Sequence, residues 1–126
     1  HPDTPNRLHK LNTLTHTYIM AKVKEMTEKY RKEGIRAVLL DAPQLFEAGA
    51  DRECDRLIAV LSEKEKRLSR ILARDGLSAE AAEKRIFAQQ DDSFFRARCP
   101  VILENNGSVA ELEEKIKAFL LENGLL

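Results

Sequence analysis

Residues 57–61 read Leu-Ile-Ala-Val-Leu, an apolar run without a polar interruption. Because no polar residue alternates with the apolar ones, the run predicts a strand buried on both faces, as in parallel sheets. Two shorter runs have the same character, Ala-Val-Leu-Leu at 37–40 and Val-Ile-Leu at 101–103. The connection over 41–55 is too short for a comfortable helical crossover, so the first two strands need not be neighbours.

Helical patterns lie before, between and after these runs. Apolar residues recur at helical spacing over about 5–33, as one helix or as two joined near His16, and Gly34 is the expected stop. A further helix is expected over about 79–90. Two Ser-x-x-Glu pairs have capping-box spacing and open helices that run to about 75 and to Gly124, at Ser62–Glu65 and Ser108–Glu111. Alternating strands and helices predict an α/β fold with a partial parallel sheet of about three strands.

The composition is that of an ordinary globular protein, with 33% charged and 43% hydrophobic residues among 126. Lys and Arg number 21, as do Asp and Glu, and aromatic residues make up 6%. This balance gives no support for a nucleic-acid or membrane partner. No apolar run approaches the roughly 18 residues that span a bilayer, and residues 1–10 lack the apolar core of a signal peptide. We therefore expect a cytoplasmic protein.

The residues that commonly bind metals are scattered. His9 and His16 lie two helical turns apart, too far to share one ion, and Cys54 and Cys99 lack the spacing of a zinc site. We expect both cysteines to be reduced thiols and no metal site built from protein ligands alone.

Four strings resemble the dephospho-CoA kinase family in order and spacing, and together they cover essentially the whole chain. They are Leu-Asn-Thr-Leu-Thr-His at 11–16, Asp-Ala-Pro-Gln-Leu-Phe-Glu at 41–47, Arg-Ile-Leu-Ala-Arg-Asp at 70–75 followed by Arg-Ile-Phe-Ala-Gln at 85–89, and Val-Ile-Leu-Glu-Asn-Asn-Gly at 101–107. The resemblance implies a P-loop kinase-like parallel sheet with flanking helices and a helical lid. It also implies phosphorylation of the ribose 3′-hydroxyl of dephospho-CoA by ATP with Mg²⁺, in coenzyme A biosynthesis.

By this resemblance the chain is a single domain, 1–126. Its segments would be a helical substrate region at 1–34, core strands at 35–62, a helical lid region at 63–98, and the last strand and helix at 99–126. The implied dephospho-CoA contacts are His16, Asp41, Pro43, Leu45 and Glu47. The implied contacts to ATP and its phosphates are Arg70, Arg74, Arg85, Asn106 and Gly107. No catalytic residue is assigned.

Each of these residues also has a structural interpretation. Arg67, Arg70 and Arg74 share a helix face by spacing, and spacing alone is more typical of a solvated face paired with glutamates. Asp41 either holds a Mg²⁺-bound water at the end of a strand or caps a turn. His16 either contacts the substrate diphosphate or organises the helical region, and Glu47 is either a substrate contact or a surface acid. The Asn106–Gly107 pair also fits a plain strand-to-helix turn with glycine at positive φ.

The departures from the family pattern limit the functional prediction. The phosphate-binding pattern G-x-x-x-x-G-K-[ST] is absent from these 126 residues, whose first residue is not Met. Thr17, Gln44 and Cys99-Pro100 stand where the family usually has Pro, Leu and Ala-Asp. We therefore expect the C-terminal portion of a dephospho-CoA kinase, inactive by itself. One alternative is a non-catalytic binding or interaction module that could form a homo-oligomer through exposed sheet edges. The other is a different P-loop nucleotide kinase.

Overall fold

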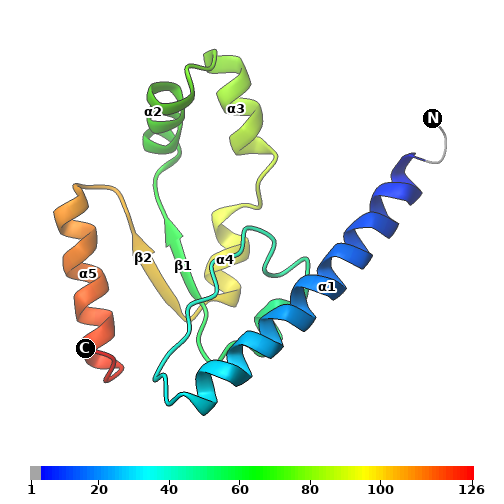
Figure 1. Cartoon of the computed structure of the whole chain (residues 1–126). Helices are drawn as coiled ribbons and strands as arrows, with labels where there is room; N and C mark the ends of the chain where they lie inside the picture. Colours follow the sequence, from blue (N-terminus) through cyan, green and yellow to red (C-terminus); the bar gives the residue numbers. More distant parts are fainter. Residues whose placement is uncertain (1–3) are drawn as a thin grey trace. The chain divides into compact units, whose positions relative to one another are not determined.

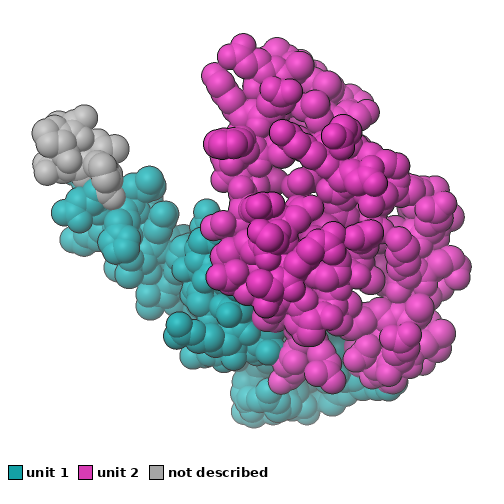
Figure 2. All heavy atoms as spheres, turned by 180° about the vertical axis from the view of Figure 1, so that it is seen from behind, with its two compact units in different colours: residues 1–54 teal, residues 55–126 magenta. Residues whose placement is uncertain are grey.

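The computed structural model describes residues 4–126 and divides the chain into two compact units (Figure 2). Residues 1–54 belong to the first unit and residues 55–126 to the second. The expectation of a single domain stays a prediction. In the described part of the chain, no helix is both long and apolar enough to cross a membrane.

The first unit begins with one long helix, α1 (Thr4–Lys32), which runs unbroken past His16, so the first of the two predicted alternatives holds. Thr17 stands where the family has proline, and its hydroxyl donates to the carbonyl oxygen of Thr13 at 2.8 Å. Because threonine keeps the backbone N–H that proline lacks, the helix continues through this position. The helix ends at Lys32, two residues before the predicted stop at Gly34, whose φ of 77° lies in the left-handed region that glycine tolerates.

The apolar segment 37–40 does not form the predicted strand, and the described residues 37–42 have no regular secondary structure. Leu39 is 85% exposed and Val38 is 47% exposed, so the segment is not buried on two faces either. A strand requires a neighbour to satisfy its backbone N–H and C=O groups, and this segment has none among the described residues. A run of turns follows over 43–49 and leads into the short 3₁₀ helix η1 (Ala50–Glu53).

The second unit is built on two parallel strands, β1 (Ile58–Leu61) and β2 (Val101–Glu104), which lie side by side in Figure 1. Ile58 is in register with Val101, and Leu61 with Glu104. The ladder continues one step further, because the backbone N–H of Asn105 donates to the carbonyl oxygen of Leu61 at 2.7 Å. The predicted α/β class and the parallel pairing of these two runs are thus confirmed.

Four helices accompany this sheet: α2 (Lys64–Asp75), α3 (Ala79–Phe87), α4 (Asp92–Arg98) and α5 (Val109–Glu122). α2 packs on α3, α4 contacts β1, and α5 contacts β2 (Figure 1). The helix expected over 79–90 ends at Phe87, and the separate helix α4 was not predicted. The buried residues of this unit come from β1, from α3 and from the end of α4; they are Ala59, Leu61, Ala82, Ile86 and Cys99.

The helix starts agree only partly with the sequence patterns. Ser108 caps α5 as predicted, since its hydroxyl accepts from the N–H of Glu111 at 3.2 Å. Ser62 does not cap α2, because the helix begins one residue later, with Glu63 at the N-cap position and no side-chain cap bond. The alternative of a turn with Gly107 at positive φ is not found, because the glycines with positive φ are at positions 34, 49, 76 and 124.

Candidate functional site

The side chains of α2 reach the loop that follows β2. The Arg70 guanidinium donates from Nη1 to the carbonyl oxygen of Asn105 at 2.8 Å, and the Lys66 ammonium donates to the carbonyl oxygen of Asn106. In the same loop, the Asn106 side-chain oxygen accepts from the backbone N–H of Glu63 at 2.7 Å. Asn106 therefore supplies, from a distant part of the chain, the N-terminal cap that α2 lacks locally.

These contacts border an open groove of about 650 Å³. Both β1 and β2 end beside it, since Glu63 follows the first strand and Asn106 follows the second. Ligands of open α/β sheets bind at this carboxyl edge. The structure thus brings Arg70 together with Asn106 and Gly107, three of the five residues predicted to contact ATP. The lining residues are Glu63, Glu65, Lys66, Ser69, Arg70, Asn106 and Gly107.

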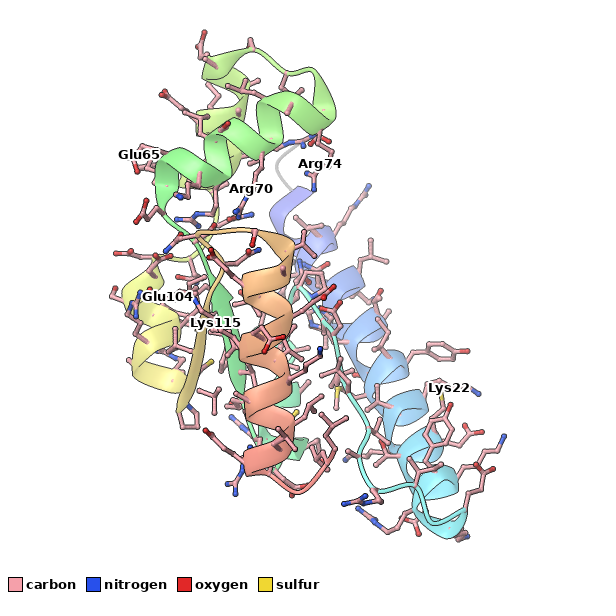
Figure 3. The ribbon with its side chains drawn as sticks, turned by 90° about the vertical axis from the view of Figure 1, so that its left-hand side faces the viewer. Lys22, Glu65, Arg70, Arg74, Glu104 and Lys115 are labelled. Atoms are coloured by element: carbon pink, nitrogen blue, oxygen red, sulfur yellow. The ribbon has the colours of Figure 1, made fainter. Side chains whose placement is uncertain are left out.

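The other two predicted phosphate contacts, Arg74 and Arg85, form a separate cluster around Asp75. Arg74 donates to both carboxylate oxygens of Asp75, at 2.7 and 2.9 Å, and Arg85 donates to Oδ2 at 2.6 Å. The hydrogen bonds from Arg74 hold the pKa of the Asp75 carboxyl below its usual value, and Arg85 acts in the same direction. Figure 3 shows Arg70 and Arg74 on the same helix, α2. Their hydrogen bonds go to different acceptors.

Arg67 has the same helical spacing as these arginines, but its side chain is partly buried and pairs with an acid of another helix. Its guanidinium lies 3.4 Å from a carboxylate oxygen of Asp92, at the start of α4, and its side chain is 27% exposed. The buried Nε of Arg67 has no hydrogen-bond partner among the described residues. Arg67, Arg70 and Arg74 therefore contact three different parts of the second unit, although the helical spacing predicts one shared face.

In the first unit, His16 of α1 contacts the turn segment 43–49. Its Nε2 lies 3.1 Å from the side-chain oxygen of Gln44. Gln44 is a departure from the family pattern, and the sequence assigned it no role, yet it is the residue that joins the two predicted substrate strings. The other predicted substrate residues lie in or just before the same turns: Asp41, Pro43 and Glu47 are exposed, and Leu45 is half-buried.

Several residues of the site were missed from the sequence. Lys66 lies four residues before Arg70 on α2, so helical spacing could have placed it on the same face. Asp75 follows Arg74 directly in the string at 70–75, but only the arginines of that string were predicted to contact phosphate. Nothing local indicates that Asn105 offers its carbonyl oxygen, or Glu63 its N–H, because both bonds join segments that are 35 or more residues apart.

No group of three or more His, Cys, Asp or Glu side chains that could hold a metal ion occurs in the described part of the chain. Asp41 lies in an irregular segment and is exposed, and it does not follow a strand as the sequence predicts.

Two solved structures share this arrangement of helices and strands. A structure from Thermus thermophilus has a TM-score of 0.73 and 33% identity, with 94% of this chain and 60% of that chain covered. The dephospho-CoA kinase from Campylobacter jejuni has a TM-score of 0.66 and 30% identity, with 98% and 62% covered. With the groove at the carboxyl edge of a parallel sheet, these likenesses define an α/β protein of the P-loop kinase fold.

The chain belongs to the dephospho-CoA kinase family, whose family model matches residues 3–111. The dephospho-CoA kinase of Symbiobacterium thermophilum is 37% identical over 114 residues, which cover 90% of this chain and 48% of the relative. That of Fusobacterium nucleatum is 33% identical over 117 residues, covering 93% and 59%. The chain thus spans between about half and three fifths of the length of the relatives that it matches. The family membership suggested by the four sequence strings is confirmed.

Proposed function

We propose that this chain is the C-terminal portion of a dephospho-CoA kinase. In the intact enzyme, the γ-phosphate of ATP would pass to the ribose 3′-hydroxyl of dephospho-CoA, the final phosphorylation of a coenzyme A precursor. The observation that carries the proposal is the groove at the carboxyl ends of β1 and β2. There, two cations of α2 and the Asn106–Gly107 loop face the same space.

Phosphoryl transfer depends mainly on positioning the phosphates and neutralising their charge. Lys66 and Arg70 supply two positive charges at the groove, and each already donates a hydrogen bond to a backbone oxygen of its wall. We propose that these donors turn to ATP phosphates, while Asn106 and Gly107 border the adenine. Arg74 and Arg85 would supply further charge from the proposed lid.

The dephospho-CoA side is assigned to the first unit. His16 and the segment from Asp41 to Glu47 approach one another through the contact with Gln44. We propose that His16, Asp41, Pro43, Leu45 and Glu47 contact dephospho-CoA, with His16 held in place by Gln44. Cytoplasmic location stays a prediction.

As a separate polypeptide, these 126 residues should lack kinase activity. They contain no G-x-x-x-x-G-K-[ST] pattern, so they offer neither the run of backbone N–H groups nor the lysine that cradle the β- and γ-phosphates. The groove described above can supply charge to phosphates, but not that cradle.

A coupled assay with ATP, Mg²⁺ and dephospho-CoA tests both parts of the proposal. The 126-residue chain should show no turnover. A chimaera should phosphorylate dephospho-CoA if it carries, before His1, the part of the Symbiobacterium thermophilum relative that precedes the region matched by this chain. Clear turnover by the 126 residues alone would show that the P-loop is not required. A folded but inactive chimaera would contradict the kinase assignment.

A non-catalytic interaction module is the second candidate. It is favoured by the apolar surface of both units, since Val60 of β1 is 57% exposed and Leu39 is 85% exposed. Such side chains on a two-stranded sheet and on an unpaired segment favour self-association. Sedimentation and calorimetric titration with dephospho-CoA separate the two candidates: a monomer that binds the ligand supports the kinase half, and a dimer that ignores it supports the module.

A further inference from the structure

Two guanidinium groups from different helices converge on one carboxylate in the second unit. Arg74, in the last turn of α2, forms a two-pronged contact with Asp75, from Nε to Oδ1 at 2.7 Å and from Nη2 to Oδ2 at 2.9 Å. Arg85, in the last turn of α3, donates from Nη1 to Oδ2 at 2.6 Å. A single anionic group thus fills a position that two cations surround.

The placement of Asp75 is unfavourable without these arginines. It is the last residue of α2, where the unpaired carbonyl groups and the helix dipole disfavour a negative charge. The Asp75 side chain is 23% exposed, whereas those of Arg74 and Arg85 are 73% and 55% exposed. The carboxylate is therefore partly covered, while both guanidinium groups remain open to a dissolved anion.

Carboxylate and phosphate oxygens accept the same guanidinium fork. Arg pairs with either group through two parallel N–H···O bonds, and phosphate has more acceptor oxygens and more charge. A phosphate that approached this cluster would find two donors already held together, with one carboxylate to displace. The net charge of the three side chains is positive, from two guanidinium groups and one carboxylate.

We propose that Asp75 is a positioning residue that holds Arg74 and Arg85 together and competes with phosphate for them. The carboxylate occupies the place of a phosphoryl group until a nucleoside triphosphate displaces it. The biological meaning of this competition rests on the proposed kinase function, but the competition itself is a property of these three side chains. A purely structural triad that pins α2 to α3 is the opposing interpretation.

The two interpretations predict different effects of Asp75→Asn on the affinity for phosphate. Asp75→Asn keeps the size of the side chain and removes the competing charge. The variant should bind inorganic tripolyphosphate about two- to twenty-fivefold more tightly than the unaltered chain, because the anion replaces two exposed ion pairs and each accounts for a factor of about 1.4 to 5. Asp75→Glu keeps the charge and should not gain affinity. A structural triad predicts no gain in either variant.

Calorimetric titration with tripolyphosphate, without Mg²⁺ and at two salt concentrations, provides the measurement. Asp91→Asn is the matched control for net charge, because Asp91 precedes α4 and makes no side-chain cap bond there. The gain from Asp75→Asn should shrink at the higher salt concentration and should fall when Arg85→Gln is added. An equal gain in Asp91→Asn, or a gain that Arg85→Gln leaves unchanged, would overturn the proposal.

A second measurement uses the unaltered chain, in case Asp75→Asn does not fold. In an NMR titration with tripolyphosphate, the Nε–H signals of Arg74 and Arg85 should shift together. If the signals of Lys66 and Arg70 respond while those of Arg74 and Arg85 stay fixed, Asp75 does not compete with phosphate. Failure of the chimaera in the kinase assay would contradict the proposed function. The calorimetric and NMR titrations would still show whether Asp75 competes with phosphate.

Discussion

Replacing Asn106 with alanine should destabilise the second unit, because it removes the cap of α2. The helix starts with Glu63 at the N-cap position, and that residue's own side chain makes no cap bond. Instead, the N–H of Glu63 donates to the side-chain oxygen of Asn106, 43 residues further along the chain. The hydrogen bond between Lys66 and the backbone oxygen of Asn106 does not depend on the side chain and should persist.

The magnitude follows from the cost of a lost cap. Replacing a capping Asn by Ala costs about 0.5–2 kcal/mol, and a neutral hydrogen bond contributes about 0.5–1.5 kcal/mol, so we expect a loss of about 1 kcal/mol. For a urea dependence of about 1–3 kcal/mol per molar, the unfolding midpoint should fall by about 0.3–1 M. The Glu63 amide should also exchange its hydrogen faster with solvent.

Asn105→Ala is the matched control, since the bonds assigned to Asn105 use its backbone N–H and carbonyl oxygen. It should change the free energy of unfolding by no more than about 0.5 kcal/mol. Asn106→Asp keeps an acceptor oxygen near the N-terminus of a helix and should retain most of the stability. If Asn106→Ala and Asn105→Ala give the same midpoint, the cap from the distant loop is not a source of stability.

Two further predictions concern charge and packing in the second unit. The hydrogen bond from Arg96 lowers the pKa of Glu104 from its ordinary value of 4.5, so its stabilising effect is present above that value and disappears as the pH falls through the lowered pKa. Glu104→Gln should therefore give a shallower loss of stability on acidification, measured as the urea midpoint from about pH 6 to about pH 3; an unchanged slope would contradict it. Ala82 of α3 is 0% exposed, so Ala82→Leu should cost about 1–3 kcal/mol by overpacking, whereas Ala73→Leu on the exposed side of α2 should cost little. Equal thermal midpoints for the two leucine variants would show that the contact of α2 with α3 is loose.

The sequence predicts most accurately the helices and strands that are marked by a local pattern, such as a capping residue or an apolar run. α5 follows from Ser108 with an apolar stripe, and β1 and β2 follow from uninterrupted apolar runs. The segment 37–40 has the same kind of run and yet forms no strand, because an apolar run indicates burial but not which neighbour will pair with it. Helix α4 was missed because it has seven residues, too few for periodicity to stand out. Its adjacent rings, Phe94 and Phe95, pack edge to face at 5.2 Å instead of marking one helical stripe.

The structure brings together some of the predicted site residues, but their contact with a ligand stays a prediction. Family resemblance indicated Arg70, Asn106 and Gly107, and the structure places all three around one groove. The start of α2 was predicted from a Ser-x-x-Glu pattern at Ser62, but the cap comes from Asn106. A capping box is a local pattern, and it competes with any better acceptor that the fold brings near from elsewhere. Such an acceptor cannot be located by spacing along the chain.

The two ends of α2 are held in chemically different ways, so we expect phosphate to compete with different acceptors for Arg70 and for Arg74. At the first end, Arg70 must leave a neutral backbone oxygen of Asn105, which no substitution of a side chain can remove. At the last end, Arg74 must leave the carboxylate of Asp75, which carries a full charge. Loosening the first end by Asn106→Ala frees the helix without adding positive charge, so it should lower stability and leave tripolyphosphate affinity nearly unchanged. Removing the charge at the last end should raise that affinity. If both variants shift affinity in the same direction and by the same factor, the helix responds as a whole to loosening, and the separate role of Asp75 is lost.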